Sequence, residues 1–246
     1  MSSGYTHSTG FNWNQLVKMP TASEEWHKGH QVLNFYPMDK NYQDSPAARA
    51  IVTKYFDDAK ALNTDAAVLK FGSDAVTLHG EYLEMGVCTG RTINFIAALN
   101  PEQHIWGFDS FDGLPEPWAR TDITVPQGTF RVNVEGWMPP VLHNVTLVKG
   151  MFHDTLPQFK TQVLKSIPIA FLHIDCDIYA SAKEIFDQLV DNIVSGTVIV
   201  FDEFYNYPGA EEHEFKAFLE FLDLTGKKAV YLAYNQFFEQ AVVKIV

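Results

Sequence analysis

Four acidic side chains follow two apolar runs of the sequence, at the point where each run stops. Asp175 and Asp177 lie in the run HIDCDIY, and Asp202 and Glu203 lie in the run VFDEF. If the two runs are neighbouring parallel strands, their carboxylates lie about 5 to 10 Å apart at one edge of a sheet. A hard divalent cation would relieve the mutual repulsion, and oxygen ligands without Cys or His favour Mg²⁺, Ca²⁺ or Mn²⁺ over Zn²⁺. Capping of the following helices by Asp177 and Asp202 is the alternative.

A glycine-containing turn follows another apolar run, EYLEMGVCTGRT. Gly86 and Gly90 stand between a predicted strand and a predicted helix, where glycine permits a tight turn and a close approach of the backbone to a ligand. The second predicted strand ends at Asp109, about 25 residues after Glu84, where an acidic side chain is placed to bind both hydroxyls of a ribose. Packing of the helix on the strand is the alternative explanation for the two glycines.

These features favour a nucleoside that carries a positive charge. The turn has the spacing GxxxG and not GxGxxG, and the acidic Glu84 just before it would repel a pyrophosphate. S-adenosylmethionine is a cationic nucleoside of this kind, whereas a dinucleotide is disfavoured. The predicted cofactors are therefore S-adenosylmethionine and Mg²⁺ or another hard divalent cation.

The elements that position these residues alternate between strands and helices from Gly80 onward, which predicts an α/β fold with a doubly wound, Rossmann-like and mostly parallel sheet. The last twenty residues form two strand-like runs separated by a short break at Asn235 and Gln236, which predicts a C-terminal antiparallel hairpin. Residues 112–140 are rich in proline and predict an irregular excursion after the second strand.

The first 63 residues differ in composition and predict a mainly helical N-terminal appendage or lid, followed by the domain predicted to bind S-adenosylmethionine over residues 64–246. Its clearest helix begins after Ser45, a candidate N-cap, with Pro46 at the first helical position. Aromatic residues near the N-terminus favour a homo-oligomer.

Composition limits the class of partner. The chain has 246 residues and a formal net charge of -12, which argues against nucleic acid because binding to phosphates depends on Lys and Arg. The two cysteines form no CxxC pair and favour a reducing compartment. No run approaches the roughly 18 apolar residues that span a bilayer, and the N-terminus lacks the features of a signal peptide. We therefore expect a cytoplasmic protein with a small-molecule partner and no membrane association.

Five runs of the chain, taken in order over roughly residues 80–222, resemble the macrocin-type O-methyltransferases. They are EMGVCTGRT, GFDSFDGLPEP, LVKGMFHDTLP, IDCDIYAS and VFDEF. That family methylates hydroxyl groups, notably those of deoxysugars on antibiotics. The resemblance implies a class I S-adenosylmethionine-dependent methyltransferase fold with a Mg²⁺ site and a small-molecule hydroxyl acceptor.

The resemblance also implies roles for individual residues. Asp177 matches the general base, and Asp175, Asp202 and Glu203 match the metal ligands. The residues that match the cofactor site are Glu84, Gly86, Gly90, Arg91, Thr92, Asp109, Ser110, Gly150, Phe152 and Asp175. The chain departs from the family at Glu203, where the family more usually has Asp, and at residues 211–213, where the family has basic residues.

Two functions of other classes stay open. A nicotinamide-dependent oxidoreductase is supported by the predicted sheet and Asp109 but opposed by the turn and the acidic cluster. A non-catalytic binding module is supported by Glu203 and the acidic segment 211–213. Within the methyltransferase function, a catechol-type acceptor offers the same vicinal oxygens to a metal as a sugar does.

Overall fold

The computed structural model describes residues 5–7, 45–133 and 135–246. Most of the predicted N-terminal appendage, residues 8–44, lies outside the described residues, and its role as a lid stays a prediction. None of the described helices is both long and apolar enough to cross a bilayer.

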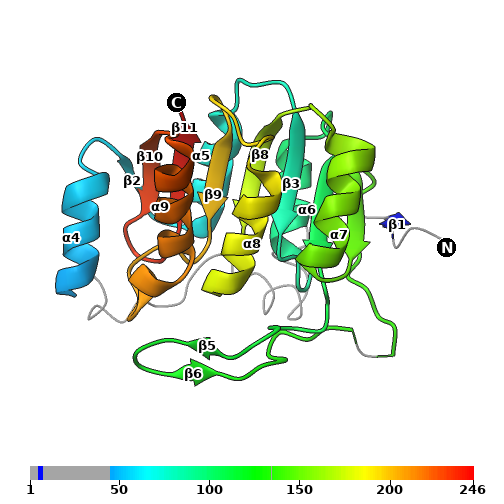
Figure 1. Cartoon of the computed structure of the whole chain (residues 1–246), viewed down its shortest axis with the longest axis horizontal. Coiled ribbons are helices and arrows are strands. Elements are labelled where there is room, and N and C mark those ends of the chain that lie inside the picture. The colour runs from blue at the N-terminus through cyan, green and yellow to red at the C-terminus, as the bar shows by residue number, and fades with distance from the viewer. Residues whose placement is uncertain (1–4, 8–44, 134) are drawn as a thin grey trace.

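A nine-stranded mixed sheet forms the centre of the molecule (Figure 1). Its strands, in spatial order, are β1 (Tyr5–His7), β7 (Val145–Lys149), β4 (Ile105–Asp109), β3 (Glu81–Met85), β8 (Ile169–Ile174), β9 (Val198–Phe201), β11 (Ala241–Ile245), β10 (Ala229–Asn235) and β2 (Lys60–Leu62). The five strands from β7 to β9 are parallel to one another. β10 and β11 are antiparallel, and β11 is also antiparallel to β9. The predicted doubly wound fold and its C-terminal hairpin are confirmed.

The parallel strands are apolar because helices cover both of their faces. Every residue of β8 and β9 is buried, which explains their nearly continuous apolar sequences. The chain crosses from β3 to β4 in one direction and continues at β8 in the other, so the strand order reverses between β3 and β8. Open α/β sheets bind ligands at such a reversal, outside the carboxyl ends of the strands.

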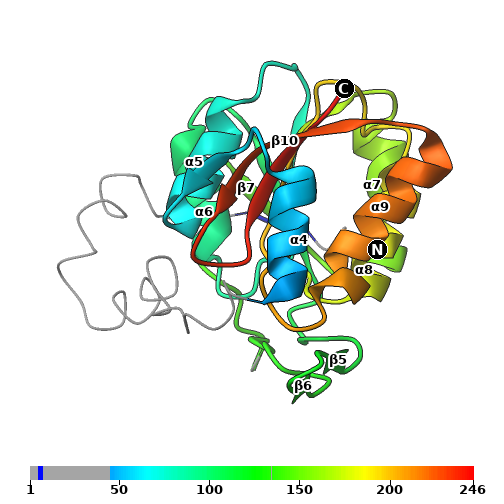
Figure 2. The same ribbon diagram turned by 90° about the vertical axis from the view of Figure 1, so that its left-hand side faces the viewer.

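Helices pack in two layers around the sheet (Figure 2). One face carries α5 (Asp65–Asp74) and α6 (Arg91–Leu99), which bury Val68, Leu69, Ile93 and Ile96. The opposite face carries α7 (Phe152–Phe159), which continues into the π-helix η2 (Lys160–Leu164), and then α8 (Tyr179–Leu189) and α9 (Glu214–Thr225). The sheet therefore has a separate hydrophobic core on each side.

The segment that precedes α5 packs against this domain. The helix expected after Ser45 is α4 (Pro46–Tyr55), and the Ser45 hydroxyl accepts a hydrogen bond from the Ala48 amide at 3.0 Å. Its Ile51 joins the core beneath α9. The chain then forms β2, a three-residue strand parallel to β10 that was not predicted from the sequence. Its residues, KAL, are too few to show an alternating pattern.

The excursion at residues 112–140 crosses below the carboxyl edge of the sheet (Figure 1). It contains a short hairpin, β5 (Trp118–Ala119) and β6 (Thr124–Val125), and is otherwise irregular as predicted. The hairpin is anchored near the short 3-10 helix η3 (Ala210–Glu212), because Thr121 donates its amide to the Pro208 carbonyl at 3.2 Å. The Trp118 and Tyr207 rings also meet edge to face at 5.7 Å.

Candidate active site

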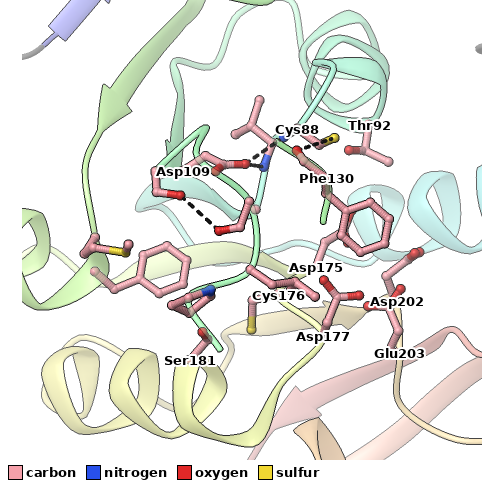
Figure 3. Close-up of a pocket in the computed structure, with 18 of the residues that line it drawn as sticks. Cys88, Thr92, Asp109, Phe130, Asp175, Cys176, Asp177, Ser181, Asp202 and Glu203 are labelled. Carbon is pink, nitrogen blue, oxygen red and sulfur yellow. Dashed lines mark hydrogen bonds between the residues drawn. The ribbon is translucent and has the colours of Figure 1, made fainter. Parts of the chain in front are cut away.

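A cavity of about 540 Å³ opens at the carboxyl edge of the sheet, where the strand order reverses. Its walls come from the segments that follow five parallel strands: 86–92 after β3, 109–115 after β4, 150–153 after β7, 175–184 after β8, and 202–203 after β9. Phe130 of the excursion completes the lining (Figure 3). A space of this size and position is typical of a small-molecule site.

The turn after β3 requires glycine at its first position. Gly86 has φ +97, and a β-carbon there would lie 1.7 Å from the carbonyl oxygen of Asp175. The backbone of this turn therefore passes directly against the turn after β8. Gly90 has φ +82 and immediately precedes α6.

Asp109 holds the same turn in place. Its Oδ2 accepts hydrogen bonds from the amides of Val87 at 2.8 Å and Cys88 at 2.7 Å, and its Oδ1 accepts one from Phe111 at 2.6 Å. The first two hydrogen bonds tie the end of β4 to the turn after β3, and the third orders the segment that follows β4. Asp109 lines the cavity, and its binding of ribose stays a prediction.

Glu84 is completely buried and stands behind the cavity wall. The Thr92 hydroxyl donates to its Oε1 at 2.9 Å, and Nδ1 of His173 lies 3.2 Å from its Oε2. Burial raises the pKa of Glu84, and the His173 and Thr92 contacts oppose that shift. Thr92 lines the cavity whereas Glu84 and Gly90 do not, and the binding of the cofactor by Glu84 and Gly90 stays a prediction.

The other predicted cofactor residues all line the cavity. Ser110, Gly150 and Phe152 stand at the end formed by the segments after β4 and β7, and Arg91 stands on the first turn of α6. Nη1 of Arg91 is buried without a hydrogen-bond partner among the described residues, 3.6 Å from Oδ2 of Asp65. Asp65 was not predicted as a site residue. It begins α5, which lies before β3 in the sequence, and it belongs to none of the motifs.

The acidic residues meet as predicted. β8 and β9 are neighbours, and Asp175, Asp202 and Glu203 each offer one oxygen such that these atoms all lie within 4.8 Å of one another. Figure 3 shows that Asp177 joins them at one end of the cavity. Burial and then the charge of Asp202 raise the pKa of Asp175, Asp177 and Glu203, and the pKa of Asp177 reaches about 7.

This cluster fits a hard divalent cation. The three residues offer only carboxylate oxygens, and Oε2 of Glu203 is buried without a hydrogen-bond partner among the described residues. Asp202 is oriented from behind, because Gln240 donates from Nε2 to its Oδ1 at 3.0 Å. Asn235 in turn donates to Oε1 of Gln240 at 2.7 Å. Oδ2 of Asp202 is thus left for a ligand. The supporting roles of Gln240 and Asn235 were not predicted from the sequence.

A phenylalanine lies next to the acids. Phe130 has φ +68 and its residue is 49% exposed, although its ring lines the cavity. Its carbonyl oxygen accepts a contact from the Cys88 thiol at 3.7 Å, which ties the excursion to the glycine turn. In Figure 3 the ring faces the end of the cavity that holds Asp175 and Asp202. Phe130 lies in the irregular excursion and was not predicted as a site residue.

Known proteins resemble this chain in family and in fold. The model of the macrocin-O-methyltransferase (TylF) family matches residues 59–221. No curated protein matches the chain significantly. Among solved structures, the calicheamicin methyltransferase CalS11 has a TM-score of 0.58 and 20% identity, over 97% of this chain and 98% of that one. The O-methyltransferase NovP has a TM-score of 0.51 and 18% identity, over 73% and 78% of the two chains. These likenesses confirm the fold.

Proposed function

Because the chain belongs to the macrocin-O-methyltransferase family and is thus an S-adenosylmethionine-dependent O-methyltransferase, we propose that it methylates a sugar hydroxyl of a natural product with the help of a divalent cation. The acidic cluster beside Asp177 carries this proposal, because it combines cation ligands with a carboxylate at the same end of one cavity. The similar CalS11 is described as a TDP-rhamnose 3'-O-methyltransferase, which supports a sugar acceptor.

The proposed position of the cofactor is along the length of the cavity. Ser110, Gly150 and Phe152 would surround the adenine, Asp109 would bind the ribose, and the turn after β3 would contact the methionine part. Arg91 suits the carboxylate of that part, since it lines the cavity and carries a permanent positive charge. This placement leaves the acidic end of the cavity for the acceptor.

The reaction moves a methyl group from a sulfonium to a hydroxyl oxygen, and the hydroxyl must lose its proton. Asp175, Asp202 and Glu203 would hold the cation, which supplies acidification of a hydroxyl bound to it. Asp177 accepts the proton as the oxygen–carbon bond forms and the carbon–sulfur bond breaks, a contribution of roughly 10² to 10⁴ in rate. Its carboxyl must be ionised for this role, and without a cation, burial and the charge of Asp202 raise its pKa to about 7.

Positioning accounts for another part of the rate. Holding the methyl carbon and the acceptor oxygen in line can supply roughly 7 to 11 kcal/mol. Phe130 offers an apolar ring face to the acceptor beside the acids, and sugars and catechols both present a face that packs on such a ring. Phe130 would therefore restrict how the acceptor lies beside the acids.

Calorimetric titration tests the cofactor and the cation first. S-adenosylhomocysteine should bind with micromolar affinity. The heat of binding measured in buffer with Mg²⁺ should differ from the heat measured in buffer with a chelator. 5'-Methylthioadenosine, which lacks the amino acid part, should bind equally to wild type and Arg91→Ala, whereas the variant should lose affinity for S-adenosylhomocysteine. Failure of S-adenosylhomocysteine to bind in either buffer would contradict the proposal.

Product formation then tests the acceptor. TDP-rhamnose and catechol, each with S-adenosylmethionine, separate a sugar acceptor from a catechol-type one. Methylation of catechol alone would replace the sugar in the proposal and leave the cation site and Asp177 in place.

A further inference from the structure

Asp177 occupies a strained turn. The amide of Ile178 donates to the carbonyl of Cys176 at 2.7 Å, which closes a three-residue turn with Asp177 at its centre and φ +65. A γ-turn of positive φ is rare and strained for a residue other than glycine. Such a conformation persists only where neighbouring groups fix it.

Two backbone contacts fix the chain as it enters this turn. The amide of Asp175 donates to the carbonyl of Met85 on β3 at 2.9 Å. The next amide, that of Cys176, donates to Oε1 of Glu214 at 3.1 Å, and the Cys176 thiol lies 3.5 Å from the same oxygen. Glu214 is the first residue of α9, so a helix distant in sequence holds the turn that carries Asp177.

Glu214 stands where a carboxyl group is costly. The residue is 0% exposed, and its Oε2 has no hydrogen-bond partner among the described residues. Burial first, and then the charges of Asp177 and Asp202, raise its pKa to about 8. The field at a helix N-terminus offsets only part of such a cost. Stability alone therefore does not account for a glutamate here.

We propose that Glu214 is a positioning residue for methyl transfer, which holds the Cys176 amide so that the Asp177 carboxyl group faces the acceptor. The inference rests on the proposed role of Asp177 as the base. Glu214 itself does not line the cavity, so it acts through the turn.

Three variants separate this role from helix packing. Glu214→Leu removes the acceptor of the Cys176 amide, and Glu214→Gln keeps a carbonyl oxygen there. The matched control is Glu220→Leu, because Glu220 lies on the same helix and accepts a hydrogen bond from the Tyr179 hydroxyl at 2.7 Å and not from the Cys176 amide.

Hydrogen exchange of the Cys176 amide gives a readout that needs no acceptor substrate. We expect exchange at least tenfold faster in Glu214→Leu, because the buried Cys176 amide loses its acceptor. Glu214→Gln and Glu220→Leu should exchange at the wild-type rate. Unchanged exchange in Glu214→Leu would overturn the proposal, whether or not an acceptor has been found.

Turnover with S-adenosylmethionine and TDP-rhamnose tests the consequence for catalysis. Glu214→Leu should lower kcat at least 30-fold with KM for S-adenosylmethionine within threefold, and Glu214→Gln should recover at least a third of the wild-type kcat. Equal losses in the Leu and Gln variants, or the same loss in Glu220→Leu, would refute positioning by this oxygen. Wild-type protein that fails to bind S-adenosylhomocysteine would count against the proposed function, and the exchange result would still decide whether Glu214 holds the turn.

Discussion

Asp65 should make the folded protein less stable as the pH rises. The residue begins α5, is 7% exposed, and has a pKa raised from 3.8 to about 7 by burial, with Arg91 opposing the shift. Between these two pKa values the folded protein binds a proton at Asp65 that the unfolded chain has released. The contribution to stability is therefore fully present below pH 3.8 and is lost as the pH rises through 7.

The size of this effect follows from the two pKa values. A difference of about three pKa units corresponds to about 4 kcal/mol in all, of which about 2 kcal/mol is lost between pH 5 and pH 6.5. Asp65→Asn keeps an oxygen for the Ala66 amide, which donates to Oδ1 of Asp65 at 2.7 Å, and it cannot titrate. The variant should therefore show a pH dependence that is shallower by about 2 kcal/mol over this interval.

Urea unfolding at pH 5.0, 5.75 and 6.5 in the presence of a chelator measures this difference. Asp74→Asn is the matched control on the same helix, because the Asp74 side chain is 64% exposed and pairs with Lys70 at the surface. It should follow the wild-type pH dependence. An Asp65→Asn profile parallel to wild type would refute the reasoning, since it would mean that Asp65 is ionised in the folded protein throughout this range.

Three further variants test the site. Asp177→Asn should lower kcat by roughly 10² to 10⁴ and leave the affinity for S-adenosylhomocysteine within twofold; wild-type turnover would eliminate Asp177 as the base. Asp109→Ala removes an acceptor of three amides, so calorimetry should show S-adenosylhomocysteine binding about 10 to 100 times more weakly, and unchanged binding would contradict its role. Gln240→Ala should weaken Mn²⁺ binding by about 10 to 100-fold because Asp202 loses its orienting amide, and equal Mn²⁺ affinity would remove Gln240 from the site.

Strand ends were the most predictable part of this molecule. Apolar runs that stop at Gly86, Asp109, Asp175 and Asp202 mark buried parallel strands, and parallel strands place their carboxyl ends at one edge. From the sequence alone, that rule predicts that the acidic residues and the glycine turn lie close together. The roles of these residues toward the cofactor, the homo-oligomer and the cytoplasmic location stay predictions.

The supporting residues were not predictable in the same way. Gln240 reaches Asp202 from the C-terminal hairpin, and Glu214 reaches Cys176 from the start of α9. Each depends on packing between elements far apart in the sequence, which no local pattern encodes. The position of Phe130 was also not predictable, because an irregular segment has no hydrophobic periodicity that shows which way a side chain points.

The acidic end of the cavity joins these observations into one argument. Burial raises the pKa of Asp175, Asp177, Glu203 and Glu214 together, so each carboxyl group makes its neighbours harder to ionise. A cation at the triad reverses this balance, because it favours the ionised form of every group near it. Binding of a cation would then stabilise the protein and ionise Asp177 in the same step. We therefore expect the cation to increase the ionised fraction of the proposed base, because it relieves the repulsion among these carboxylates.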